Sequence, residues 1–161
     1  MRYSLSDYIL SIKIPDELIG VFTSTDNESE NRLSIGGDGS YVGSIKVSTS
    51  DIFKVEGNAT GSWIHNKSKN KTGSLEISLN QLSDSTLKLT RLFETYYSAD
   101  TITDGMTITI SKSAGNGNSL DVCTLVDCYI SKMPDGAWDT EAKTQTWTFT
   151  CGKITYSGDA M

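Results

Sequence analysis

The chain contains a single histidine, His65, so any histidine-based catalytic set must use it. His65 opens the polar stretch HNKSKNK at residues 65–71, with no cysteine and no G-x-S-x-G motif of a nucleophilic serine close by. A metal site on His65 would need three further ligands, and no pair at metal-ligand spacing occurs. We therefore interpret His65 as a histidine of a surface loop and predict neither a catalytic residue nor a metal ligand.

Acidic and glycine-rich stretches could hold a cation or a phosphate group. Asp26, Glu28 and Glu30 alternate along the chain, and calcium takes such oxygen ligands, but the ligand order of an EF-hand is absent. The glycine-rich fragments at residues 35–40 and 113–119 lack the G-x-x-x-x-G-K-[ST] motif, and neither precedes a predicted helix. We interpret the acidic stretch as a solvated loop and the two fragments as turns, and we predict no cofactor.

The three cysteines, Cys123, Cys128 and Cys151, form neither an even set nor a C-x-x-C pair. The sequence therefore indicates neither a disulfide framework nor a zinc ribbon. We expect these residues to be small reduced side chains in the core or in strands.

Length and composition favour one folded domain over residues 1–161. Hydrophobic residues make up 37% of the chain and recur in short patterned runs, which argues against global disorder. There is no long apolar run, and the N-terminal stretch lacks the apolar region of a secretory signal, so we expect a soluble, cytoplasmic chain without a membrane segment. The net charge of −6 argues against tight binding to a nucleic acid backbone.

Apolar and polar residues alternate in several short segments, which is the pattern of strands with one buried face. In residues 73–79, Leu75, Ile77 and Leu79 share one face and the polar residues between them share the other. The polar residues 16–40 predict a long loop or arm. The predicted strands cover residues 3–14, 41–47, 51–57, 73–79, 105–112, 119–132 and 144–156.

The apolar period changes to that of a helix in residues 84–98, which predicts one α-helix there. Ser83 or Ser85 can cap its first turn, which contains Asp84. The helix face that we expect to pack on the core consists of Leu89, Leu92, Phe93 and Tyr96.

Most successive strands have no helix between them, so they lack the crossover that parallel pairing requires. We therefore predict a mainly β fold, an antiparallel β-sandwich or barrel with one flanking α-helix. In the last strand, Trp147 and Phe149 alternate with threonines, which favours a buried face over a binding platform. We expect Trp138 to pack in the core or in a turn.

Three segments carry a resemblance to a known family. They are GDGS at residues 37–40, NKSKNKTGSLEISLNQLSDSTLKLTRLFE at residues 66–94, and DCYISKMPDGAWDTEAKTQTWTFTCGKI at residues 127–154. The second joins a glycine-led strand to a serine-capped helix, and the third joins a Lys-x-Pro-Asp stretch to a strand of alternating Trp, Thr and Phe. In this order they resemble the tail-tube proteins of contractile-tailed phages and phage-like particles.

The resemblance implies a structural protein and not an enzyme. In that family, homo-hexameric rings stack into a hollow tube, and DNA or another cargo passes through the lumen without specific binding. A tail sheath protein surrounds the tube, which polymerises on a baseplate or tube initiator. The resemblance thus places the chain in the tail of a virion that is assembled in the host bacterial cytoplasm.

The resemblance also assigns expected roles to parts of the chain. The strand at residues 73–79 should help to form the ring wall, with Glu76 and Ser78 toward solvent or lumen. The loop from Trp63 through Lys71 is a candidate contact between rings, because Trp and Lys in one polar loop make a poor core but a workable interface. A surface loop with Trp63 packed into its own domain is the alternative. The candidate contact residues are Trp63, His65, Lys67 and Lys69.

An interaction module is the competing interpretation of the whole chain. A small β-sandwich adhesion or carbohydrate-binding module would also be rich in Ser, Thr, Asn and exposed aromatic residues. Within the tube class, the sequence leaves open whether the chain is a tube protein or a tube initiator. It also leaves open whether the particle carries DNA or is a headless injection device.

Overall fold

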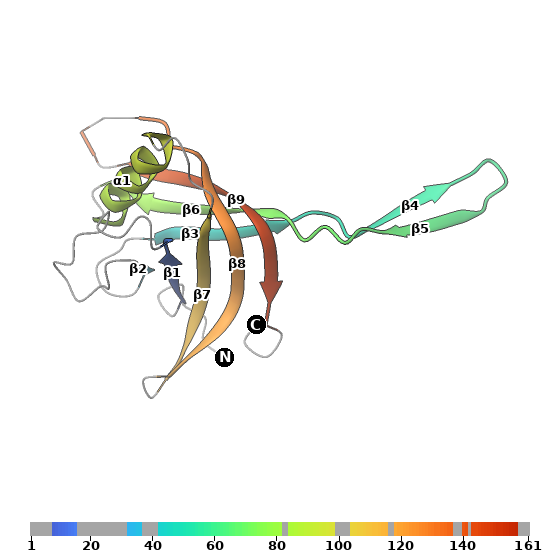
Figure 1. The fold of residues 1–161 in the computed structure, drawn as a ribbon, viewed down its shortest axis with the longest axis horizontal. Coiled ribbons are helices and arrows are strands. Elements are labelled where there is room, and N and C mark those ends of the chain that lie inside the picture. Colours follow the sequence, from blue (N-terminus) through green and yellow to red (C-terminus); the bar gives the residue numbers. More distant parts are fainter. Residues whose placement is uncertain are drawn as a thin grey trace.

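A computed structural model describes residues 8–15, 32–36, 42–81, 84–98, 104–115, 118–136, 140–141 and 143–157. Nine strands and one helix lie in these ranges (Figure 1). The strands are β1 (Tyr8–Lys13), β2 (Arg32–Gly36), β3 (Val42–Thr49), β4 (Phe53–Gly57), β5 (Trp63–Lys67), β6 (Gly73–Asn80), β7 (Met106–Gly115), β8 (Asn118–Lys132) and β9 (Thr144–Tyr156). The helix is α1 (Asp84–Ser98).

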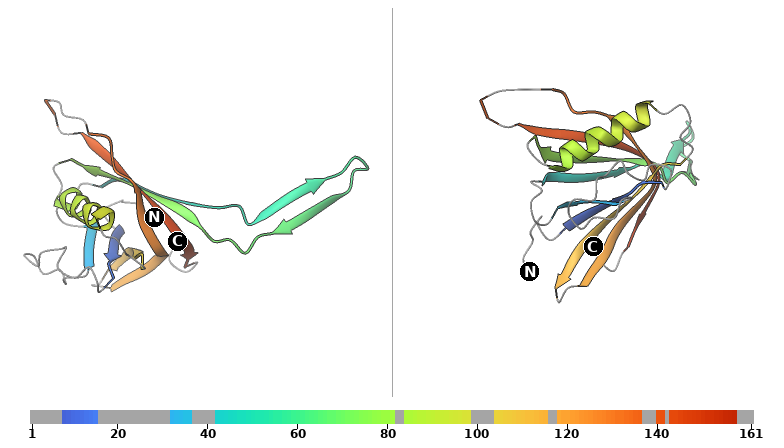
Figure 2. Two further views of the ribbon diagram at one scale, coloured as in Figure 1. Left: turned by 45° about the horizontal axis from the view of Figure 1, so that its top comes forward. Right: turned by 60° about the vertical axis from the view of Figure 1, so that its left-hand side comes forward.

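Seven strands form one antiparallel sheet in the order β2-β1-β7-β8-β9-β6-β3. This sheet curls into a half-barrel, and β4 and β5 form a separate hairpin that extends from β3 and β6 (Figures 1 and 2). The predicted mainly β fold with a helix at 84–98 is confirmed. The sheet is an open half-barrel, because its edge strands β2 and β3 do not pair with each other.

Two strands were not predicted. β2 lies inside the stretch 16–40 that was interpreted as a loop, and β5 lies inside the predicted loop from Trp63 through Lys71. β2 is short, but its two buried residues Leu33 and Ile35 alternate and pair with β1. The other residues of the predicted loop at 16–40, which include the GDGS turn and the acidic residues 26–30, lie outside the described residues. Trp138 also lies outside them.

The hydrophobic core fills the concave side of the half-barrel. Alternate residues of the strands in the seven-stranded sheet point into it, as the period of two predicts, and Leu75, Ile77 and Leu79 of β6 are fully buried. Trp147 and Phe149 of β9 are also buried, so the prediction of a buried face is confirmed. The three cysteines are free thiols in this core, as predicted. A thiol hydrogen bond to Cys151, with burial, raises the pKa of Cys128.

Helix α1 covers the concave side of the sheet and contacts β2 and β6, which lie in opposite halves of the half-barrel (Figure 2). Leu89 and Leu92 are fully buried, while Phe93 and Tyr96 pack partly buried against the core. The helix begins at Asp84, so Ser85, one of the two predicted caps, lies inside the first turn, and the other, at position 83, lies outside the described residues. One helix thus closes the core that the open sheet leaves exposed.

A β-bulge bends β8 at Asp127, which has a positive φ of 58°. The pairing of β7 with β8 shifts register between Met106 and Ile108, opposite this residue. Gly105 lies so close to Asp127 that an added Cβ would come within 2.5 Å of its Oδ1 atom and 2.9 Å of its backbone carbon. Because Gly105 has no side chain, it can lie close to Asp127 at the bulge, and this close approach lets the sheet curl tightly there.

The buried Trp147 gives a test of the core. Its ring is 1% exposed, and its Nε1 atom has no hydrogen-bond partner among the described residues. Because an unpaired buried donor is costly, we expect Trp147→Phe to change the free energy of unfolding by less than about 1.5 kcal/mol. Trp147→Ala should cost about 3–5 kcal/mol, because it leaves a cavity. Chemical denaturation of both variants measures the difference, and equal losses would contradict this account.

Candidate interaction surface on the hairpin arm

Residues 51–71 form an arm that projects from the body of the molecule (Figure 1). Backbone hydrogen bonds hold the neck of this arm together, from Ser50 N to Thr72 O at 2.9 Å and from Ser68 N to Ile52 O at 2.6 Å. Beyond the neck, β4 and β5 pair in antiparallel register. The arm is thus a continuation of the β3–β6 pair, carried away from the core.

The tip of the arm is a defined turn centred on Asn58. Its side-chain oxygen accepts hydrogen bonds from Thr60 N at 3.1 Å, from Thr60 Oγ1 at 2.7 Å and from Ser62 N at 3.0 Å. Gly61 follows with a φ of 85°, a conformation in which glycine is favoured. Asn58 N also donates to Ser62 O at 3.0 Å. These bonds fix the two strands in one register.

The register places unlike side chains on the two faces of the arm, because directly opposite residues of an antiparallel pair share a face. The pairs Phe53–Lys67, Val55–His65 and Gly57–Trp63 lie on one face, which we call the aromatic face. The pairs Lys54–Asn66 and Glu56–Ile64 lie on the other. Most of the apolar side chains of the ribbon therefore lie on one side.

These apolar side chains are exposed to solvent. Trp63 is 68% exposed, and Phe53 and Val55 are each 60% exposed. A lone two-stranded hairpin is at best marginally stable in water, and exposed apolar patches mark sites of protein association. The aromatic face is therefore a candidate contact surface for another protein molecule.

The predicted contact residues occupy defined places on this arm. Trp63, His65 and Lys67 lie together on the aromatic face, and Lys69 lies in the neck just beyond β5. They belong to a strand and its end, and not to the predicted loop. The alternative in which Trp63 packs into its own domain is wrong, since most of this side chain is exposed. The register with β4, which the sequence alone does not reveal, adds Phe53 and Val55 to the surface.

The convex face of the sheet is lined by hydroxyl groups. Ser44 Oγ donates to Ser78 Oγ at 3.2 Å, and Ser78 Oγ lies 3.3 Å from Thr146 Oγ1, so a row of hydroxyls crosses β3, β6 and β9. In the neighbouring row, the exposed Glu76 lies between Lys46 and Thr148. The two residues expected to face solvent or lumen, Glu76 and Ser78, thus lie on a polar, mostly uncharged surface.

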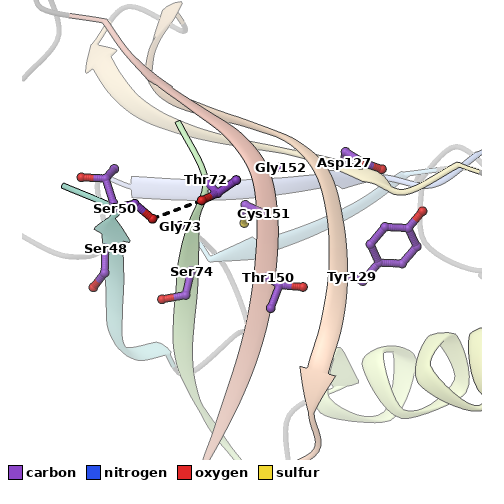
Figure 3. A pocket seen from close by; sticks show the side chains of 11 residues that line it. Ser48, Ser50, Thr72, Gly73, Ser74, Asp127, Tyr129, Thr150, Cys151 and Gly152 are labelled. Atoms are coloured by element: carbon purple, nitrogen blue, oxygen red, sulfur yellow. Dashed lines mark hydrogen bonds between the residues drawn. The ribbon is translucent and has the colours of Figure 1, made fainter. Parts of the chain in front are cut away.

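An open depression of about 620 Å³ lies where the neck of the arm leaves this face (Figure 3). Ser48, Ser74 and Thr150 line it from three neighbouring strands, and Asp127 supplies its only carboxylate. Burial and the adjacent Asp127 raise the pKa of Tyr129, whose phenol can donate a hydrogen bond. The lining contains no histidine and no nucleophile paired with a base, so it offers polar contacts and no evident covalent chemistry.

The described part of the chain contains no group of three or more residues that could hold a metal ion. Its one helix is neither long enough nor apolar enough to cross a membrane.

Comparison with known proteins gives one family and several related folds. Residues 33–158 match the family model described as bacteriophage PhiTE tail tube protein. No curated protein matches the chain.

Two of the solved structures that share the fold cover nearly the whole chain. One is a chain of the structure described as the PVC sheath/tube terminator of an extracellular contractile injection system in the extended state, with a TM-score of 0.61, 12% identity and 98% of each chain covered. The other comes from the sheath-tube complex of the same kind of system, with a TM-score of 0.59, 13% identity, and 97% of this chain and 91% of that chain covered. At such low identity these likenesses support a common fold over nearly the whole length.

Proposed function

The chain belongs to the bacteriophage PhiTE tail tube protein family, and from this we propose that six copies close into a ring and that such rings stack into the inner tube of a contractile tail or phage-like injection particle. In this proposal a sheath protein surrounds the tube, and a baseplate or tube initiator starts its polymerisation. The tube belongs to the virion tail and is assembled in the host cytoplasm. The role is structural rather than catalytic.

Ring closure is supported by the two edges of the sheet. β2 and β3 are different strands at opposite edges, and each presents backbone groups that a further strand can pair with. Pairing of β2 in one copy with β3 in the next is a heterologous contact. Such a contact closes a ring when the rotation from one copy to the next is a whole fraction of a full turn. Assembly thereby protects edges that would otherwise promote aggregation.

The hydroxyl-lined convex face is our candidate for the lumen wall. Its rows of Ser and Thr, with Glu76 and Ser78 among them, offer DNA no dense array of cations. Because tight binding to the phosphate backbone depends on Lys and Arg, cargo can slide along such a surface. The net charge of −6 agrees with passage without specific binding.

We assign the contact between rings to the arm. The main observation that supports this proposal is the exposed aromatic face of the arm. The arm reaches away from the core, and its tip and register are fixed by hydrogen bonds. Its aromatic face needs a partner surface to be buried. A neighbouring copy in the next ring supplies that surface.

Negative-stain electron microscopy of the purified protein, combined with size-exclusion light scattering, tests the proposal. Rings or hollow tubes with about six subunits per layer are expected, since closed cyclic symmetry is its central claim. A chain that remains monomeric at high concentration, also when a baseplate or tube initiator is present to start polymerisation, would contradict it. A glycan-binding screen would then test the carbohydrate-binding module, the competing interpretation.

Trp63→Ala should shorten the tubes and lower their yield, with a critical concentration for assembly at least about tenfold higher, because buried Trp anchors dominate interfaces. His65→Ala on the same face should have a smaller effect. Ile64→Ala is the matched control, since Ile64 is 64% exposed on the opposite face of the same strand. Electron microscopy and pelleting measure length and yield. If Trp63→Ala and His65→Ala assemble like the parent chain, the arm is not the ring contact.

A further inference from the structure

Two of the three free cysteines face each other across neighbouring strands. Cys128 of β8 lies directly opposite Cys151 of β9 in the antiparallel register, and the Cys128 thiol donates a hydrogen bond to the Cys151 sulfur. Directly opposite residues of an antiparallel pair have Cα atoms about 4.5–5.5 Å apart, and disulfides span Cα separations of about 4.4–6.8 Å. A bond between the two sulfur atoms therefore fits the sheet as it stands.

The third cysteine has no such neighbour. Cys123 lies in the same strand as Cys128 and is equally well buried, but it lies opposite Tyr156. Burial, with the nearby Cys151, raises the pKa of Cys123. Cys123 is thus both a control thiol in the same core and the alternative partner for Cys151.

Cys151 is the member of the pair that a small molecule can approach. It is among the residues that line the open depression of about 620 Å³ at the neck of the arm, and it is 4% exposed (Figure 3). Its neighbours there are Gly73, opposite it in β6, and Gly152, which follows it in β9, and neither has a side chain that could cover it. Cys128 is fully buried and does not line the depression. A small oxidant that enters the depression therefore meets Cys151 first.

The hydrogen bond also makes the two thiols unequal. It lowers the pKa of Cys151, against the opposite effect of burial, and it raises the pKa of Cys128 together with burial. The thiolate is the form of cysteine that reacts with oxidants. Cys151 is therefore the nucleophile of the pair, and Cys128 is the thiol that can react with its oxidised form.

We propose that Cys128 and Cys151 are a peroxide-sensitive thiol pair, which oxidation converts into a disulfide between β8 and β9. In the first step, the Cys151 thiolate attacks one oxygen of hydrogen peroxide, the O–O bond breaks, hydroxide leaves and Cys151 becomes a sulfenic acid. In the second step, the Cys128 sulfur attacks the Cys151 sulfur, the S–O bond breaks, and the departing hydroxide leaves as water with the proton of Cys128. The two thiols lose two electrons, and one peroxide is reduced to two waters.

This chemistry belongs to the single chain and goes beyond the proposed tube function. Only its timing rests on that function. Thiols stay reduced in a bacterial cytoplasm, where we place assembly, and disulfides persist outside the cell. The pair would then be reduced while the tube is built and oxidised after the particle is released.

Oxidation of the purified full-length chain tests the proposal. After treatment of the reduced protein with hydrogen peroxide, intact-mass spectrometry should show the loss of two hydrogen atoms, and alkylation under denaturing conditions should label one cysteine in place of three. Protease digestion without reductant should yield the Cys128 and Cys151 peptides joined to each other. A Cys123–Cys151 link, a link only between two chains, or three unreacted thiols would overturn the proposal.

Alanine variants separate the roles of the three thiols. Cys123→Ala is the matched control and should form the disulfide like the parent chain. Cys128→Ala should form no disulfide, and its Cys151 sulfenic acid should be trapped by a dimedone probe. Cys151→Ala should leave Cys128 unreacted, since Cys128 is fully buried. Equal rates of thiol loss in Cys151→Ala and in the parent chain would contradict the assignment of Cys151 as the nucleophile. The peptide map of the parent chain decides the pairing even where a core variant fails to fold.

Thermal unfolding measures what the bond does to the fold. A disulfide that closes the loop between β8 and β9 should raise the unfolding temperature of the oxidised parent chain by about 6–12 °C, and dithiothreitol should reverse the rise. Cys123→Ala should show the same rise on oxidation. An unchanged or lower unfolding temperature would show that the bond does not stabilise the sheet, which overturns its role as a link between β8 and β9. None of these readouts depends on ring or tube formation, so failure of the tube function leaves them unaffected.

Discussion

Gly73→Ala is expected to destabilise the fold strongly. Gly73 is the first residue of β6 and lies directly opposite Thr49 of β3 and Cys151 of β9. A Cβ atom at this position would clash with the Ser48 carbonyl oxygen and would lie 2.5 Å from Ile154 Cδ1. The Ser48 carbonyl oxygen belongs to the backbone of β3, which pairs with β6, so it cannot rotate away from the added Cβ atom. We expect the free energy of unfolding to fall by at least about 3 kcal/mol, which is at the severe end for single substitutions.

Gly57→Ala is the matched control for this substitution. Gly57 ends β4 in the arm, and an added Cβ would meet only the Ser62 carbonyl oxygen, at 3.9 Å. Thermal unfolding should show a fall of about 6–12 °C or more for Gly73→Ala and little change for Gly57→Ala. A Gly73→Ala protein with the unfolding temperature of the parent chain would show that β3 and β6 are less closely packed than the structure indicates.

The core of the fold could be predicted from the sequence because burial leaves a period in it. Leu75, Ile77 and Leu79 alternate since one side of β6 is dry, and the helix repeat of Leu89 and Leu92 arises because one side of α1 faces the sheet. The free buried cysteines and the antiparallel pairing followed from equally local signals. Where a segment packs on the core, its pattern predicts its structure.

The arm was predicted only in part, as a strand at residues 51–57, because neither of its two strands has a buried side. All five residues of β5 are exposed, and polar residues at 65–67 give the appearance of a loop. The strand exists through backbone pairing with β4 and through the turn at Asn58. An asparagine followed three residues later by Gly61, between two strand-like segments, is the one sequence signal that could have indicated a hairpin. The common face of Trp63 and Phe53 depends on the register, which composition does not reveal.

Removal of the arm should separate folding from assembly. A variant in which Asn-Gly replaces residues 51–70 keeps the hydrogen bond between Ser50 N and Thr72 O, at 2.9 Å. It also keeps Lys71, whose carbonyl oxygen accepts a hydrogen bond from Ile154 N at 3.0 Å. The side chains of β4 and β5 are all exposed, so the free energy of unfolding should change by less than about 1 kcal/mol.

Assembly of the armless variant should fail at a specific step. The edges β2 and β3 remain intact, so single rings should still form, whereas stacking should be lost because the aromatic face is gone. Electron microscopy would then show isolated rings at concentrations where the parent chain forms tubes. Tubes of normal length from the armless chain would contradict the ring-to-ring role of the arm. A monomeric armless chain would instead show that the arm of one copy also holds its neighbours within a ring, since the sheet edges would then be insufficient for closure.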